Sequence, residues 1–213
     1  MKSFLIVGTG TFGHHLCHEL SKTKCDIMIA DQSSDAMDDL LPLVVSAKVG
    51  DCTNIDVLRS FGIPSFDACF VCVKSDFQAC LEITDQLKEL GAKKIYSKAD
   101  RELEAKFLTR AGADRIIFPE REAAARIAVS ESSDRIFDFI QLAENYAICE
   151  ISPRAEWVGH TVAELGFRAK YGLNLVAAKK GTQVRPVLDP GYTFSADEHV
   201  LVLGSITDVR KAT

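Results

Sequence analysis

Near its N-terminus the chain reads Ser3-Phe-Leu-Ile-Val-Gly8-Thr-Gly10-Thr-Phe-Gly13, and this stretch predicts the fold. The apolar first half is typical of a buried strand, and it runs directly into the spacing G-x-G-x-x-G and then a helical pattern. Gly8 permits a tight turn, Gly10 lets the backbone approach a phosphate, and Gly13 lets the helix pack closely. The stretch therefore indicates a strand, a phosphate-binding turn and a helix.

From this stretch to about residue 130, strand-like and helix-like segments alternate. We expect strands at 3–7, 26–30, 43–49, 67–73, 94–98 and 115–118, and helices at 12–22, 34–40, 54–61, 76–90, 101–110 and 120–130. Short connections between such segments favour a parallel sheet with helices on both faces. The predicted fold class is α/β, a Rossmann-like doubly wound sheet.

The pattern changes after residue 130, where a polar break is followed by an apolar stretch. We therefore divide the chain into a nucleotide-binding domain (1–130), a crossover or hinge (131–143) and a small α+β ligand-binding domain (144–213). In the last part we expect strands at 145–151, 173–180, 182–187 and 199–203, a short helix near 161–165, and turns at Lys180-Gly181 and Asp189-Pro-Gly191.

Two aspartates follow the second and third expected strands. Asp31 ends the apolar run that begins at Ile27, close to the position where a carboxylate accepts hydrogen bonds from ribose hydroxyls. The alternative is that Asp31 caps a helix opening at Ser33. Asp51 is expected beside an adenine ring, or equally as a helix cap. The glycine loop and Asp31 together predict an adenine nucleotide site.

Composition excludes several classes of protein. The 213 residues carry a formal net charge of −5, which leaves no basic surplus for binding DNA or RNA. Apolar runs are too short to cross a bilayer or to form a signal peptide, and the seven cysteines have no disulfide-framework spacing. We expect a cytoplasmic protein.

Two further patterns have a structural and a functional interpretation. Cys69 and Cys72 are spaced as C-x-x-C, but in a buried strand positions three apart point to opposite faces, so a redox or zinc role is disfavoured. His14 and His18 share a helix face and could bind a metal, but the sequence favours the simpler interpretation of an exposed polar face.

Several longer strings extend the pattern over nearly the whole chain: Gly8-Thr-Gly-Thr-Phe-Gly13, Gly50-Asp-Cys-Thr53, Gly91-Ala-Lys-Lys-Ile95 with Lys98-Ala99, Ala111-Gly-Ala-Asp-Arg-Ile-Ile-Phe-Pro-Glu120 and Arg168-Ala-Lys-Tyr-Gly-Leu-Asn174. Together they resemble the regulatory subunits of Ktr and Trk potassium-uptake systems. The resemblance implies an RCK N-terminal nucleotide domain followed by a small RCK C-terminal ligand domain. It also implies gating of a potassium channel subunit in place of chemistry.

By this resemblance, ATP or ADP, or alternatively NAD or NADH, binds the loop that includes Thr11 and Phe12. Asp51 and Cys52 would line the adenine pocket, and Lys98 would lie near the phosphates. Glu120 would approach the terminal phosphate at a dimer interface and help hold Mg²⁺ or Ca²⁺. Ktr relatives commonly carry arginine where this chain has Thr11, which weakens the prediction that ATP is preferred over ADP or NAD.

The resemblance also suggests a second ligand and a set of partners. Arg168, Asn174 and Pro186 match positions that line a cyclic di-AMP pocket in Ktr relatives; the alternative is a solvated arginine followed by a turn asparagine. The expected assembly is a dimer forming an octameric ring beneath a KtrB- or TrkH-like channel subunit, peripheral to the inner face of the membrane. The alternative function is an NAD-dependent oxidoreductase; a redox-sensing transcription factor is disfavoured because a basic helical module is missing.

Overall fold

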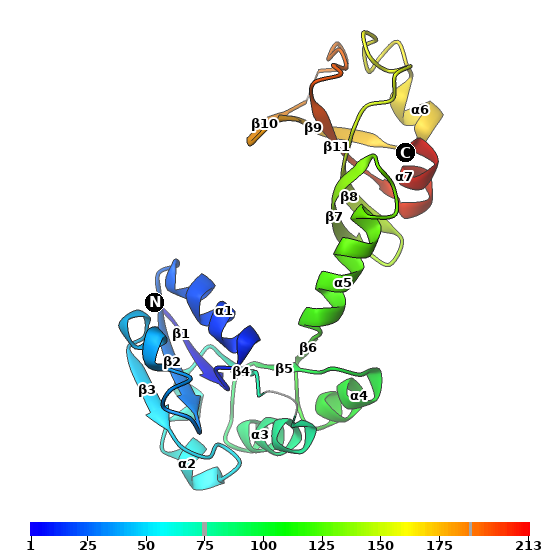
Figure 1. The fold of residues 1–213 in the computed structure, drawn as a ribbon. Coiled ribbons are helices and arrows are strands. Elements are labelled where there is room, and N and C mark those ends of the chain that lie inside the picture. The colour runs from blue at the N-terminus through cyan, green and yellow to red at the C-terminus, as the bar shows by residue number, and fades with distance from the viewer. Residues whose placement is uncertain (74–75, 188) are drawn as a thin grey trace. The chain divides into compact units, whose positions relative to one another are not determined.

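The computed structural model describes residues 1–73, 76–187 and 189–213. They form two compact units, Met1–Arg121 and Glu122–Thr213, shown in Figure 1. Each unit has its own sheet and its own apolar core, and each is described by itself.

The first unit is built on a six-stranded parallel sheet with the order β3-β2-β1-β4-β5-β6. Its strands are β1 (Lys2–Val7), β2 (Cys25–Asp31), β3 (Ser46–Val49), β4 (Ala68–Val71), β5 (Ile95–Lys98) and β6 (Arg115–Ile117). The chain leaves β1 in one direction to build β2 and β3, and later returns to the other side of β1 to build β4. A crevice forms at the carboxyl ends of strands where the order reverses in this way. The predicted Rossmann-like sheet is confirmed.

The helices of the first unit are α1 (Thr11–Ser21), α2 (Ile55–Arg59), α3 (Phe77–Glu89) and α4 (Glu102–Arg110), with 3₁₀ turns η1 (Asp38–Leu43) and η2 (Ile63–Ser65). A fifth helix, α5 (Pro119–Ser130), begins at the end of this unit and continues into the second, and none of its residues is buried. The α-helix expected at 34–40 is wrong, because the segment holds a 3₁₀ turn that begins only at Asp38. Pro42 lies inside that turn and lacks the N–H that a longer α-helix would need.

Alternating side chains of the strands supply two cores, one on each face of the sheet. Leu5 and Val7 pack with the core that includes Leu87 of α3, while Ile6 packs with Cys17 of α1. Cys69 belongs to the first core and Cys72 to the second, so the prediction that they point to opposite faces is confirmed. Burial raises the pKa of each thiol to about 12, which leaves both protonated at neutral pH.

The second unit is an antiparallel sheet with the order β10-β9-β11-β8-β7. Its strands are β7 (Ile136–Ala143), β8 (Tyr146–Ile151), β9 (Asn174–Lys180), β10 (Gln183–Pro186) and β11 (His199–Ser205), with short helices α6 (Phe167–Tyr171) and α7 (Ile206–Ala212). The predicted turn after Lys180 is confirmed, with Gly181 at a φ of +59° between β9 and β10. The core of this unit centres on Trp157, Phe167 and Phe194.

Two expectations for the C-terminal half differ from the structure. The helix expected near 161–165 is wrong, because this segment is a turn and the helix begins at Phe167, which is buried against Trp157. The range 131–143, expected as a crossover, contains β7 at the edge of the sheet. Its ladder with β8 shifts register twice, and such bulges break the alternation that identifies a strand in a sequence.

Candidate functional site: a glycine loop between two hollows

The glycine loop connects β1 to α1, and there is no room for a side chain at Gly8 or Gly13. Gly8 has a φ of +91°, and a Cβ there would lie 2.8 Å from the backbone of Cys72 and Val73. A Cβ on Gly13 would lie only 2.0 Å from the carbonyl oxygen of Gly8. Because α1 begins at Thr11 with Gly10 as its N-cap, a side-chain cap is not available, and the first backbone amides are left for an anion.

Asp31, at the end of β2, is bound to this loop. Its Oδ2 accepts hydrogen bonds from the backbone N–H of Thr9 at 2.7 Å and from the Thr9 hydroxyl at 2.9 Å. Its Oδ1 accepts from the N–H of Ser33 at 3.0 Å, although no helix opens at Ser33. The carboxylate therefore orients the loop, and because it is only partly buried it still faces the crevice.

A hollow of about 360 Å³ opens at the carboxyl ends of β1, β2 and β3. Its walls bring together the predicted residues Gly8, Gly10, Asp31, Asp51 and Cys52, and also Gln32, Thr53 and Asp76, which were not anticipated from the sequence. The volume and the mixture of apolar walls with a few carboxylates suit a nucleoside.

Asp51 and Cys52 form one side of this hollow. Asp51 Oδ1 accepts hydrogen bonds from Thr53 N–H at 2.9 Å, Thr53 Oγ1 at 2.7 Å and Gln32 Nε2 at 3.0 Å. The bonds from Thr53 lower the pKa of Asp51. The cap of α2 is Asn54, so Asp51 is not the cap residue. Burial raises the pKa of Cys52 to about 12, so its side chain is a neutral wall of the hollow.

A second hollow of about 260 Å³ lies on the other side of Gly10 and includes Thr11, Phe12, Lys98 and Glu120 in its lining. Lys98 Nζ lies 2.9 Å from Asp100 Oδ1 and 3.1 Å from Glu120 Oε1. Burial by itself would lower the pKa of Lys98, but the hydrogen bonds to Asp100 and Glu120 outweigh it and raise the pKa. The ammonium group is therefore charged at neutral pH and already shared by two carboxylates.

Comparison with known proteins identifies the family of this chain. Residues 4–119 match the family model of the TrkA-N domain, and residues 147–213 match that of the TrkA-C domain. Over 212 residues the chain is 34% identical to Ktr system potassium uptake protein C of Bacillus subtilis, covering 99% of this chain and 95% of the relative. The chain belongs to the TrkA family of potassium-uptake proteins.

Solved structures similar to this TrkA-family chain share its fold. The GsuK RCK domain superposes with a TM-score of 0.69 at 14% identity, covering 98% of this chain and 46% of that one. The GsuK channel bound to NAD gives a TM-score of 0.68 at 15% identity, covering 97% of this chain and 38% of that one. This chain thus spans less than half of either GsuK chain, and the likeness is one of fold.

In the TrkA-C part of the chain, the three residues predicted for a second ligand do not all line one hollow. Arg168 of α6 and Asn174 of β9 line a hollow of about 190 Å³, together with Asp189. Pro186, at the end of β10, is exposed and is not among the residues lining this hollow. A phosphodiester there would face one cation and one nearby carboxylate.

Asp76 and Asp100 are two of the polar residues at the nucleotide hollows that were not predicted from the sequence. Asp76 is the N-cap of α3 and accepts a hydrogen bond from the N–H of Ala79 at 3.0 Å. An aspartate directly before a helical pattern is a typical N-cap, so the sequence could have predicted this role of Asp76. No local signal identifies Asp100 as a partner of Lys98, since the pairing depends on how the end of β5 turns.

Proposed function

We propose that this TrkA-family chain is the nucleotide-binding regulatory subunit of a potassium-uptake system. One observation carries the proposal: the glycine loop separates two hollows of suitable size, at the reversal of strand order, in a chain that matches both TrkA domains. Family membership favours this regulatory role over an NAD-dependent oxidoreductase.

We place the adenosine part of the nucleotide in the larger hollow. Asp31 there accepts hydrogen bonds from the ribose hydroxyls with the lone pairs that Thr9 and Ser33 leave free. Asp51 and Cys52 lie beside the adenine ring. The phosphates then cross Gly10 and the first turn of α1, where unpaired amides and the helix dipole favour negative charge.

The terminal phosphate or second nucleotide half enters the smaller hollow, near Lys98 and Glu120. Asp100 and Glu120 already neutralise Lys98, so a phosphate there meets two carboxylates as well as one ammonium. A divalent cation, Mg²⁺ or Ca²⁺, held in part by Glu120 would offset this repulsion. Thr11 contributes a neutral hydroxyl, so we expect weak discrimination between ATP, ADP and NAD.

The regulatory step is a shift between assembly shapes. A nucleotide can favour one shape of a dimer or octameric ring only by the difference in its affinity for the two shapes. In the described parts of this chain, every helix is too short or too polar to span a bilayer. We propose that ion conduction belongs to a separate membrane potassium channel subunit, with this chain on its cytoplasmic side. Cyclic di-AMP at Arg168 and Asn174 is a second proposed input.

The test is nucleotide binding by the full chain, measured by isothermal titration calorimetry with ATP, ADP and NAD, with and without Mg²⁺. We expect saturable binding, and we expect Asp31→Asn to weaken it about tenfold because a charged hydrogen bond to ribose is lost. The matched control is Asp35→Asn, an exposed aspartate four positions later. Absence of binding to every adenosine compound would contradict the proposal.

A second measurement addresses the regulatory role. Potassium uptake is followed in cells that lack their own uptake systems and express this chain with a Ktr-type membrane subunit. We expect uptake to require the chain and to fall with Asp31→Asn but not with Asp35→Asn. Nucleotide-dependent redox activity without any effect on potassium uptake would favour the oxidoreductase alternative.

A further inference from the structure

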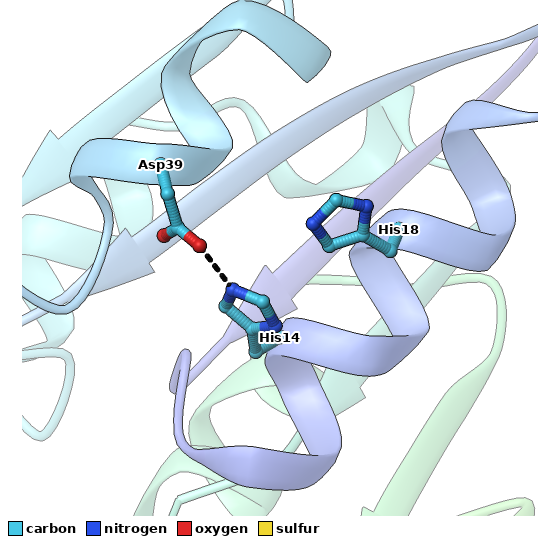
Figure 2. Close-up of side chains that lie close together, drawn as sticks. All are labelled: His14, His18 and Asp39. Atoms are coloured by element: carbon cyan, nitrogen blue, oxygen red, sulfur yellow. Dashed lines mark hydrogen bonds and ion pairs between the residues drawn. The ribbon is translucent and has the colours of Figure 1, made fainter.

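Three side chains that could bind a metal meet on the surface of the first unit. His14 and His18 lie on α1 and Asp39 lies on η1, as Figure 2 shows. One ligand atom from each lies within 4.8 Å of the other two. The closest pair is His14 Nε2 and Asp39 Oδ2 at 2.5 Å. None of these residues lines either of the two nucleotide hollows.

The core holds the two elements in this arrangement. His14 and His18 are one helical turn apart, so they share a face of α1. Met37 and Leu40, on either side of Asp39 in the chain, are buried in the same core as Cys17 of α1. Their packing fixes η1 against α1, and the carboxylate is held beside the imidazoles without any contribution from a metal.

The donor set is specific in its chemistry. Two imidazole nitrogens and one carboxylate oxygen are the ligands of zinc-type sites with an open position, and calcium and magnesium prefer sets made of oxygen alone. Three such atoms bound to one ion at about 2.1 Å lie about 3.4 Å apart in a tetrahedral arrangement. The three ligand atoms lie within 4.8 Å of one another, so rotation of the side chains can bring them to this separation. The ion would then replace the direct contact between His14 and Asp39.

Access also suits a cation. The side chain of Asp39 is 62% exposed and that of His14 is 29% exposed, so an ion and its remaining water ligands can enter from solvent. The simpler interpretation is a solvated ion pair between His14 and Asp39, which would leave His18 without a role.

We propose that His14, His18 and Asp39 bind a divalent transition-metal ion of the zinc class, joining α1 to η1. The backbone N–H of His14 donates to the carbonyl of Gly10 at 2.9 Å, so the ion would bind one helical turn from the phosphate-binding loop. An ion that binds only the folded state stabilises it by mass action. This inference does not depend on the proposed nucleotide function.

The test uses the full chain, free of nucleotide and without an affinity tag. Co²⁺ is titrated and its visible d–d absorption recorded, and Zn²⁺ is then added to displace it. We expect one equivalent of Co²⁺ to bind, and we expect His18→Gln and Asp39→Asn each to weaken binding at least about tenfold. The control is His15→Gln, an exposed histidine of the same helix that is outside the cluster. It should bind as the unmodified chain does.

Several results would overturn the proposal. They are absence of d–d absorption at one equivalent of Co²⁺, equal affinity in His18→Gln and the unmodified chain, or a sulfur-to-cobalt charge-transfer band, which would assign the ion to cysteines. Far-UV circular dichroism of each variant distinguishes loss of a ligand from loss of the fold. If His18→Gln unfolds, the more conservative His18→Asn must still show weakened binding in a folded protein, or the proposal fails.

Discussion

At the scale of single residues, Glu150 of β8 is the most deeply buried carboxylate of the second unit's described part. It is 8% exposed. Its Oε2 accepts from Lys179 Nζ at 2.5 Å, and its Oε1 lies 2.8 Å from His199 Nδ1. Burial by itself would raise the pKa of Glu150, but the bonds to Lys179 and His199 outweigh it and hold the pKa below its usual value. Glu150 therefore stabilises the folded unit in its ionised form.

We predict that Glu150→Gln lowers the free energy of unfolding by about 2 kcal/mol at pH 7, because Lys179 loses a charged partner. The folded-state pKa is lower than the unfolded one, so the stabilisation is full above the unfolded value of about 4.3 and disappears as pH falls through the folded value. The difference between the two proteins should therefore narrow in acid. Urea unfolding at pH 7 and at acidic pH measures this difference in the free energy of unfolding. The control is Glu144→Gln, at an exposed position. A difference that widens in acid would contradict the prediction.

At the scale of secondary-structure elements, α1 packs against the glycine loop with no room for a side chain at Gly13. A Cβ on Gly13 would lie 2.0 Å from the Gly8 carbonyl oxygen and 3.2 Å from Cys72 Cβ. Neither neighbour can move freely, because one is backbone and the other is in the buried core. The position of α1, and with it the free amides at its N-terminus, therefore depends on a residue without a side chain.

We predict that Gly13→Ala lowers the free energy of unfolding by about 3 kcal/mol, since overpacking forces the helix away from the loop. Nucleotide affinity should fall in parallel, because the amides move. Calorimetry and urea unfolding followed by far-UV circular dichroism measure the two effects. His15→Ala, at an exposed position of the same helix, should change neither. Unchanged binding in a stable Gly13→Ala protein would show that α1 is not held by this contact.

At the scale of the whole molecule, the two units have separate apolar cores, and their unfolding can be followed by different spectroscopic signals. The sequence holds one tryptophan, Trp157, which is fully buried in the second unit among Phe167, Tyr171 and Phe194. Its fluorescence reports on the second unit alone, whereas far-UV circular dichroism reports on both. Ligand effects can therefore be assigned to one unit without cutting the chain.

We predict that saturating adenine nucleotide raises the midpoint of the circular dichroism transition assigned to the first unit and leaves the tryptophan transition unchanged. The reason is that only the folded state of the unit carrying the glycine loop binds the ligand. At about 100 times its Kd, the ligand should add about 2.7 kcal/mol to the stability of that unit. The Asp31→Asn variant provides the control. An equal shift of the tryptophan transition would mean that the two units unfold together.

Much of the first unit could be predicted from local signals. The apolar strands, the helical periods and the glycine spacing all act over a few residues, and they were sufficient for the parallel sheet and for the crevice at its carboxyl edge. Signals were weaker in the second unit. The bulges in β7 interrupt the alternation of apolar and polar residues that predicts a strand. The helix α6 has only five residues, too few to show a helical period. The helix α7 was not predicted, although Ser205 caps it by accepting a hydrogen bond from the N–H of Asp208 at 3.0 Å.

Local sequence patterns are enough to predict the fold class, the phosphate-binding turn and the carboxylate after the second strand, because each follows from backbone conformation and the periodicity of nearby residues. Which distant side chains meet depends on the packing of the folded chain. Asp39 beside His14, Asp100 beside Lys98, and Arg168 apart from Pro186 depend on how separate elements pack. Packing depends on how all the core side chains fit together, and it cannot be predicted from patterns that extend over only a few residues.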